Sequence, residues 1–327
     1  MKKIIFIAVV AMILNFNYIQ DHWQVSLTMV FGSLIAGATS EGGGAVAFPV
    51  FTKLLQINPT DAKNFSLAIQ SVGMTMATIV IIYLGIRVEW RVIRWASLGG
   101  IIGIIISSIW LAPILPPAII KMSFTAMISS FAITLFILNR NQRIFNKHLI
   151  IFENTERIIL IGAGFLGGMM SGLVGNGIDI ITFSIMVLLF KMNEKIATPT
   201  SVILMAINAL VGFSVQIFIL DGLNPQVYAY WQAAIPVVII GAPLGAIICS
   251  RLNRIIIVRT LLVLIAIELI SSVLLIPLTA MVTISGIITF MVFSIIYYWI
   301  YHIKRYEKKN WQKSPKCPSI RSIEILR

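Results

Sequence analysis

Charged side chains are scarce in this chain, at 11% of its 327 residues, whereas soluble domains carry roughly a quarter. Hydrophobic residues make up 58% of the chain, and the mean hydropathy is +0.96. This composition excludes a soluble globular protein and predicts an all-α polytopic membrane protein. At about 20 residues a span, the chain accommodates about eight to ten spans. No stretch remains that is large enough for a separate catalytic domain.

Cysteine is nearly absent, and so are the motifs of metal and nucleotide chemistry. The two cysteines, Cys249 in an apolar stretch and Cys317 near the end, form neither a disulfide framework nor a metal site. The chain has no phosphate-binding loop of the GxxxxGK[ST] type. We therefore expect no metal, no cofactor and no direct use of ATP.

Positive charge is the exception to this scarcity, with a formal net charge of +13. Segment 304–327 alone carries eight Lys and Arg residues. Basic residues of membrane proteins collect in cytoplasmic segments, where they meet the anionic inner leaflet. The charge therefore indicates a lipid bilayer as partner rather than nucleic acid, and it predicts a cytoplasmic C-terminus.

The first residues resemble a signal peptide, because Lys2 and Lys3 precede the apolar run Ile4–Leu14. A small-residue cleavage pattern does not follow this run. We therefore favour an uncleaved N-terminal helix within residues 1–24 over a cleaved signal.

Two membrane-length apolar stretches are interrupted by glycines beside a carboxylate. The first reads GATSEGGG at 37–44, and the second reads SGLVGNGID at 171–179. Glycine destabilises a helix relative to alanine, so such clusters unwind it locally. Inside a bilayer the freed backbone groups survive only against protein or a wet cavity. Paired broken helices in two halves of a chain are typical of the binding site of a secondary transporter.

The basic residues also predict how the interrupted stretches lie in the membrane. If each enters and returns on one side as a hairpin, loops 85–94, 139–157 and 251–259 with their arginines fall inside. A full crossing of the first stretch would move loop 85–94 outside, against the preference for cytoplasmic arginine. With hairpins, the lysines that remain outside are Lys53, Lys63 and Lys121.

Hairpins that enter from opposite sides make the two halves inverted repeats, each a broken or re-entrant helix hairpin followed by three transmembrane helices. The alignment of Asn58–Ala62 with Asn193–Ala197 supports a duplication. The predicted units are an N-terminal helix at 1–24, repeat 1 at 25–138, a cytoplasmic linker at 139–157, repeat 2 at 158–277, an extra helix at 278–303 and a basic cytoplasmic tail at 304–327.

These residues resemble a known family. The first glycine group with Phe48 and Pro49 after it, the second group at 172–177 and the sequence ATPTS at 197–201 resemble the sulfite exporter TauE/SafE family, over residues 25–277. The resemblance implies a multi-pass transporter of the bacterial inner membrane, since several members are linked to export of sulfite or small organosulfonates. The chain departs from the family pattern at Glu41, where a smaller residue is more usual, and it has no proline after the second glycine group.

We therefore predict a secondary transporter, an exporter of a small anion that works by alternating access. Unwound glycines and the starts of half-helices present N–H groups that bind anions, and nearby polar side chains can add donors. The alternative is that the small residues only allow close helix contact. The predicted substrate-binding residues are Thr39, Ser40, Gly42, Gly43, Gly44, Ser171, Gly175, Asn176 and Gly177.

Glu41 and Asp179 are the predicted coupling residues. A carboxylate at mid-membrane costs at least about 2.5–3.5 kcal/mol on insertion scales, so it marks a functional hypothesis. Loss of hydration favours the neutral form, which would let Glu41, with Asp179 second, bind and release a proton during transport. The alternatives are a carboxylate in a water-filled vestibule and one that accepts backbone N–H bonds.

Other polar residues within the apolar stretches receive weaker assignments. Gln70, Ser71 and Asn208 follow the interrupted stretches and are predicted to line the pathway, or else to join helices by hydrogen bonds. We expect Glu268 to have a structural role, and Lys63 to be a solvated loop residue or else to attract anions at the outer mouth.

The residues leave other functions open. Glu41 and Asp179 could serve a cation-linked permease that uses H⁺ or Na⁺. A scaffold protein is disfavoured, because it would not need mirrored helix breaks. An intramembrane enzyme is disfavoured, because the histidines lie in loops or at span ends and no second aspartate lies within a span. The substrate, the direction of flux, the coupling ion and the oligomeric state stay undetermined by the sequence.

Overall fold

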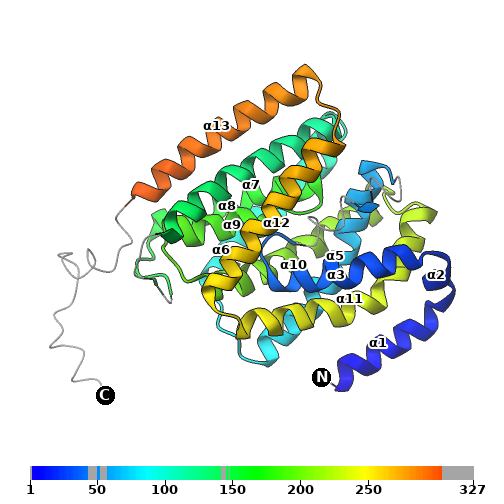
Figure 1. The fold of residues 1–327 in the computed structure, drawn as a ribbon. Helices are drawn as coiled ribbons and strands as arrows, with labels where there is room; N and C mark the ends of the chain where they lie inside the picture. Colours follow the sequence, from blue (N-terminus) through cyan, green and yellow to red (C-terminus); the bar gives the residue numbers. More distant parts are fainter. Residues whose placement is uncertain (1, 43–49, 52–56, 141–144, 147, 304–327) are drawn as a thin grey trace, which may run out of the picture.

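The computed structural model describes residues 2–42, 50–51, 57–140, 145–146 and 148–303, and every regular element among them is a helix (Figure 1). Within these residues, eight helices are long and apolar enough to cross a membrane. This confirms the predicted all-α polytopic class. The eight are α5 (Pro59–Tyr83), α6 (Trp90–Ile106) with its π-helical end η2 (Ser107–Leu111), α7 (Pro117–Arg140), α8 (Asn154–Val174), α10 (Glu194–Phe218), α11 (Pro225–Arg251), α12 (Arg254–Leu275) and α13 (Ala280–His302).

Shorter helices complete the described part of the chain. They are α1 (Lys2–Leu14), α2 (Phe16–Asp21), α3 (Trp23–Ala38) and α9 (Ile178–Ser184) with its π-helical continuation η3 (Ile185–Leu189). The predicted single N-terminal helix is divided at Asn15, whose side-chain Nδ2 donates to the Ala11 carbonyl at 2.9 Å. Asparagine competes in this way with the backbone for hydrogen bonds, which favours helix ends over helix interiors.

Asparagine side chains cap the N-terminal ends of three of the spans. Asn58 Oδ1 accepts from Thr60 N at the start of α5, Asn193 Oδ1 from Lys195 N at α10, and Asn224 Oδ1 from Val227 N at α11. Each bond satisfies an amide that has no partner within its helix. Proline at the first position of α5 and of α11 fits the same role, because that position needs no N–H.

Glycines let two pairs of helices touch backbone to backbone. A Cβ atom at Gly37 of α3 would overlap the Ala242 carbonyl oxygen of α11, and one at Gly99 of α6 would overlap the Ile161 carbonyl oxygen of α8. Small residues serve this purpose in membranes, where van der Waals contact drives helix association. The two contacts fix α3 on α11 and α6 on α8.

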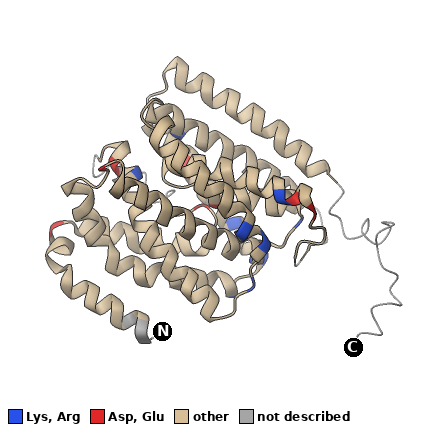
Figure 2. Ribbon diagram, turned by 180° about the vertical axis from the view of Figure 1, so that it is seen from behind, with Lys and Arg blue, Asp and Glu red and all other residues tan. Residues whose placement is uncertain are grey.

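Further helix contacts complete the bundle. Helix α11 also packs on α5, as α6 packs on α10, while α5 contacts α10 and α7 contacts α12. Helix α13 packs on α7, and α1 packs on α11 at the opposite edge of the bundle (Figure 1). Figure 2 shows long stretches of helical ribbon without a charged residue.

The loops that carry most of the arginines meet at one end, which we call the arginine-rich end. Leu149 N donates to Glu89 Oε2 at 3.0 Å, and Asn146 N donates to the Lys191 carbonyl at 2.9 Å. Arg254 Nη1 donates to Asn139 Oδ1, also at 2.9 Å. The loops between α5 and α6, α7 and α8, η3 and α10, and α11 and α12 therefore lie together.

The other loops meet at the far end of the spans, called here the opposite end. Asn64 Nδ2 donates to the Gly222 carbonyl, and Asn224 Nδ2 donates to Asp61 Oδ1, both at 2.9 Å. Residues 112–117, which join η2 to α7, border the same surface. The start of α5, the loop before α7 and the loop before α11 thus share one end.

This grouping predicts which positions can be labelled from the same side of a membrane. In a background with both native cysteines replaced by serine, Arg87→Cys and His148→Cys should react with a membrane-impermeant maleimide from one side. Thr60→Cys and Ile114→Cys should react only from the other, since all four side chains are exposed at the two ends. Labelling of positions 87 and 60 from the same side would contradict the arrangement.

Candidate functional site

The second glycine group interrupts the helical backbone between α8 and α9. Gly175 has a φ angle of +97° and Gly177 one of +148°, a region that side chains other than glycine rarely adopt. Helix α8 therefore ends at Val174, and α9 begins four residues later at Ile178. The predicted break is present at 175–177.

The first glycine group also ends a helix. Helix α3 stops at Ala38, Thr39 is extended, and Gly42 has a φ angle of +75°. Residues 39–42 are buried. Gly43 and Gly44, two of the predicted substrate-binding residues, lie outside the described residues.

The two breaks meet inside the protein, although more than 130 residues separate them. Asn176 Nδ2 donates to the Glu41 carbonyl oxygen at 3.0 Å. A Cβ atom built on Gly42 would lie 3.5 Å from Asp179 Oδ2 and 3.6 Å from Asn176 Nδ2. Four of the predicted binding and coupling residues, Glu41, Gly42, Asn176 and Asp179, are thus brought into one place.

Two amides of the second break already have acceptors. Gly177 N donates to Asp179 Oδ1, and Ile178 N donates to Ser171 Oγ, both at 3.1 Å. Asp179 thereby holds the start of its own half-helix with one carboxylate oxygen. In this conformation these two amides are used internally, and the anion-binding role predicted for the break stays a prediction.

Several buried polar atoms at the breaks have no hydrogen-bond partner among the described residues. Both carboxylate oxygens of Glu41, the second oxygen of Asp179 and the hydroxyl of Ser40 belong to this group. Their side chains are 1–2% exposed. Because nearly all buried polar groups in proteins are paired, such a cluster marks a place where a proton, water or ligand completes the pairing.

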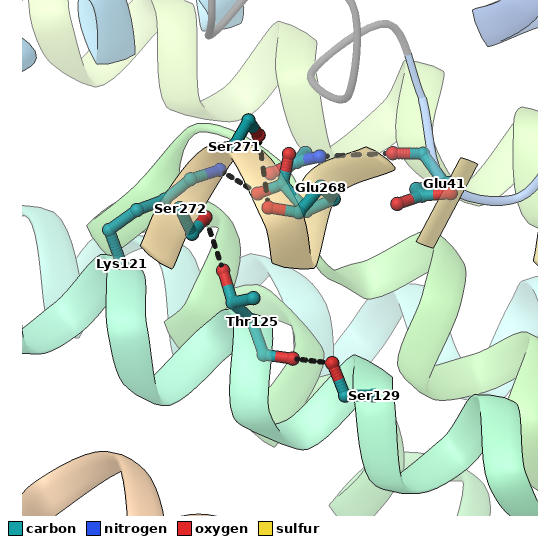
Figure 3. Close-up of polar contacts among 8 residues, drawn as sticks. Glu41, Lys121, Thr125, Ser129, Glu268, Ser271 and Ser272 are labelled. Atoms are coloured by element: carbon teal, nitrogen blue, oxygen red, sulfur yellow. Dashed lines mark hydrogen bonds and ion pairs between the residues drawn. The ribbon is translucent and has the colours of Figure 1, made fainter. Parts of the chain in front are cut away.

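A buried ion pair lies next to this cluster. Lys121 Nζ of α7 contacts Glu268 Oε1 of α12, and Glu268 lies between Lys121 and Glu41 in Figure 3. Glu41 interacts electrostatically with both members of the pair and with Asp179. Ser271 and Ser272 flank Glu268 on α12, and Ser272 Oγ shares a 2.9 Å hydrogen bond with Thr125 of α7 (Figure 3). Glu268, expected to be structural, therefore touches the candidate site.

A cavity of about 90 Å³ lies beside the breaks. Its walls are mostly apolar, and its polar lining comprises Ser33, Lys63, Ser66, Gln70, Lys121 and Asn176. One water molecule needs about 10–15 Å³ of such space, so the cavity can hold several waters or a small anion. A wider depression at the opposite end shares Pro59, Lys63, Pro117, Ile120 and Leu173 with the cavity, which therefore opens toward that end.

Among the described residues two lysines line the cavity, and Lys121 is the functional candidate that sequence reasoning missed. Lys63 was expected to be a solvated loop residue, but it lies in the first turns of α5, half-buried at the junction of cavity and depression. Within the described residues it has no hydrogen-bond or ion-pair partner. Lys121 is 8% exposed. Neither lysine carried a clear signal in the sequence, because both lie near the start of a span, where interfacial lysines are common.

The predicted pathway residues have different surroundings. Gln70 lines the cavity and donates to Ser66 Oγ at 2.7 Å, while Ser66 Oγ donates to the Gly175 carbonyl. Ser71 donates to Ala68 O within its own helix. Asn208 is buried near Gly100, and neither its Nδ2 nor its Oδ1 has a partner in the described part of the chain. Thr39, a predicted substrate-binding residue, donates its hydroxyl to the Ile35 carbonyl of α3.

Metal binding finds no support in the described residues, which contain no group of three or more His, Cys, Asp or Glu side chains that could hold an ion. The site instead consists of interrupted helices, carboxyl groups and two lysines around a small cavity. In a polytopic helical membrane protein, this combination is typical of a secondary transporter.

Comparison with known families agrees with this class. The model of the family Sulfite exporter TauE/SafE matches residues 25–274. The chain belongs to this family of membrane transporters, as the glycine pattern predicted. No curated protein and no solved structure matched the chain.

The contact between the breaks predicts unequal effects at two buried asparagines. Asn176→Leu should destabilise the protein by about 1–3 kcal/mol, because it leaves the Glu41 carbonyl without its donor. Asn208→Leu, of matched size and burial, should be neutral or stabilising, because it removes atoms that lack partners among the described residues. Thermal unfolding of the purified variants in detergent tests the pair. Equal unfolding temperatures would argue that the Asn176 bond does not hold the breaks together.

Proposed function

We propose that the protein is a secondary transporter that exports a small anion, such as sulfite or an organosulfonate, across the bacterial inner membrane by alternating access. Membership of a sulfite exporter family supports the anion class. The observation that carries the proposal is the meeting of two helix breaks beside a small cavity with two lysines. A small anion and the lipid bilayer are the proposed partners.

Alternating access rests on the proposed inverted repeats. Exchange of α3 with α8, α5 with α10, α6 with α11 and α7 with α12 maps the contact of α3 with α11 onto that of α8 with α6. It also maps the contact of α5 with α11 onto that of α10 with α6. The asparagine caps of α5 and α10, at the aligned residues Asn58 and Asn193, agree with this exchange. If the halves swap conformations, the opening moves from one side of the membrane to the other.

The proposed hairpins enter from opposite ends. At the arginine-rich end, Asn146 contacts Lys191 and Asn193, so the chain after η3 returns to the end at which α8 began. At the opposite end, His22 before α3 packs on Tyr230 of α11 with ring centroids 5.0 Å apart. Ile57 N donates to Phe51 O at 2.9 Å, which ties the chain after the first break to the start of α5. These contacts support two re-entrant hairpins.

The orientation follows from the basic residues. We assign the arginine-rich end, and the C-terminal tail beyond α13, to the cytoplasm, because cytoplasmic loops of membrane proteins carry the excess of Lys and Arg. The cavity then opens to the outside, through the depression that Lys63 borders. In an export cycle this is the conformation from which the anion leaves.

Proton coupling is assigned to Glu41, with Asp179 second. Their partner-free oxygens face the same small volume, where a proton would remove the repulsion between an anion and the carboxyl groups. The same oxygens could ligate a monovalent cation, so a cation-linked permease is the second candidate function.

Reconstituted protein should catalyse flux of radioactive sulfite into liposomes, with methanesulfonate as a competitor. Lys63→Gln should weaken the apparent affinity by about tenfold or more, because it removes a charged donor from the cavity. Lys195→Gln, at a lysine of the arginine-rich end, serves as the control. Sodium flux without sulfite flux would favour the cation-linked alternative.

Glu41→Gln should remove the response of transport to a pH gradient. If a proton moves with the anion, methanesulfonate, whose charge is constant near neutral pH, should accumulate in the more alkaline compartment with wild-type protein. Net export from a cell then requires an outward anion gradient that exceeds the inward proton gradient. In the variant, exchange at equal pH should continue, but the gradient should no longer drive accumulation. Glu156→Gln replaces another buried carboxyl, in the capping box of α8, and should behave as wild type. Unchanged pH dependence in Glu41→Gln would contradict the assignment.

A further inference from the structure

The ion pair of Lys121 and Glu268 joins the cavity to the buried carboxyl groups. Lys121 lines the cavity from α7, whereas Glu268 is 1% exposed on α12. On its other side Glu268 faces Glu41, which carries the two partner-free oxygens (Figure 3). The pair is therefore accessible to an anion through its lysine and connected to the proposed coupling residue through its glutamate.

The charges of this region do not balance. Among the described residues, three carboxyl groups, Glu41, Asp179 and Glu268, interact around one lysine, Lys121. In a water-poor interior an unpaired carboxylate is costly, because the attraction that offsets its lost hydration is missing. Any anion that reaches Lys121 adds a further negative charge. Its binding is therefore tied to the arrival of a proton.

We propose that the transported anion and Glu268 compete for Lys121, and that Glu268 takes up one proton when the anion displaces it. This inference rests on the proposed function and names the residues that link the anion to the proton. In the resting state the Lys121 ammonium pairs with the Glu268 carboxylate. In the bound state it pairs with the anion, while the proton from solution resides on the Glu268 carboxyl. Anion and proton enter together, so the net charge of the site is unchanged.

The released Glu268 carboxyl has defined neighbours. The titratable and charged groups that face it are Lys121 from α7, Glu41 after α3 and Asp179 from α9. A protonated Glu268 can donate to a Glu41 oxygen, which lacks a donor among the described residues. The proton is then held by the two carboxyl groups together, so the coupling role of Glu41 and the protonation of Glu268 belong to one site. This connects the anion in the cavity to the break at which the first hairpin turns.

The competition predicts a pH dependence of anion binding that can be measured without transport. For wild-type protein in detergent, methanesulfonate affinity should fall as the pH rises. The decrease should reach about tenfold per pH unit where one proton is taken up with each anion. Calorimetry in buffers with different ionisation heats should report about one proton taken up for each anion bound.

Glu268→Gln should bind methanesulfonate with an affinity that no longer depends on pH, and without proton uptake. Lys121→Gln should bind it about tenfold more weakly or worse, because the charged donor is lost. Either single change leaves one buried charge without its partner and could destabilise the protein. The double variant Lys121→Gln with Glu268→Gln removes both charges and so separates loss of binding from loss of stability. It should unfold at a temperature near that of wild type, yet fail to bind the anion.

A matched control is the buried pair of Arg254 and Glu194, whose charged atoms lie 3.5 Å apart at the arginine-rich end, away from the cavity. Arg254→Gln with Glu194→Gln should keep the wild-type affinity and proton uptake. If the double variant at Lys121 and Glu268 binds methanesulfonate as wild type does, the pair is structural and the inference is wrong. Proton uptake that persists in Glu268→Gln overturns it as well.

These outcomes are distinct from failure of the proposed function. Wild-type protein that neither binds nor transports sulfite or methanesulfonate would overturn the anion transporter itself. Wild-type protein that transports both, with Lys121→Gln and Glu268→Gln indistinguishable from it, would overturn only the competition for Lys121.

Discussion

The structure depends on how polar groups deep in an apolar bundle find partners without water. Where the backbone breaks after α8, Ser171 and Asp179 accept the freed amides, and Asn176 spans to the carbonyl of Glu41 in the other break. Each break is therefore completed by groups that the interruption itself brings close. A continuous helix at either place would remove the hydrogen bond between the Asn176 side chain and the Glu41 carbonyl. The two interruptions are stable because they meet.

Much of this could be predicted from local sequence. Three of the glycines with positive φ angles, Gly42, Gly175 and Gly177, belong to the clusters that indicated unwinding. Scarcity of charge predicted the helical membrane class, and the loops chosen for their arginines do lie at one end. Such features follow from composition and spacing along the chain, which a single sequence displays directly.

The electrostatics of the site could not be predicted in the same way. Lys121 and Glu268 are separated by most of the second repeat, and their contact depends on how α7 packs against α12. Near the start of a predicted span, Lys121 looks like an ordinary interfacial lysine. Sequence likewise does not reveal that Asp179 turns one oxygen back onto Gly177, leaving only the other directed at Gly42. These are properties of packing between distant segments.

The dimensions of the cavity connect these electrostatics to selectivity. A small cavity with mostly apolar walls makes an anion give up much of its hydration. A fixed positive charge offsets this lost hydration. Two lysines supply that charge, one at the mouth and one beside the breaks. A cavity with two permanently free lysines would hold the anion too tightly to release it. An ion pair between the lysine and a nearby carboxylate prevents such tight binding, because the carboxylate takes the place of the anion when the anion leaves. The Glu268 carboxylate thus makes binding at Lys121 reversible, as a transport cycle requires.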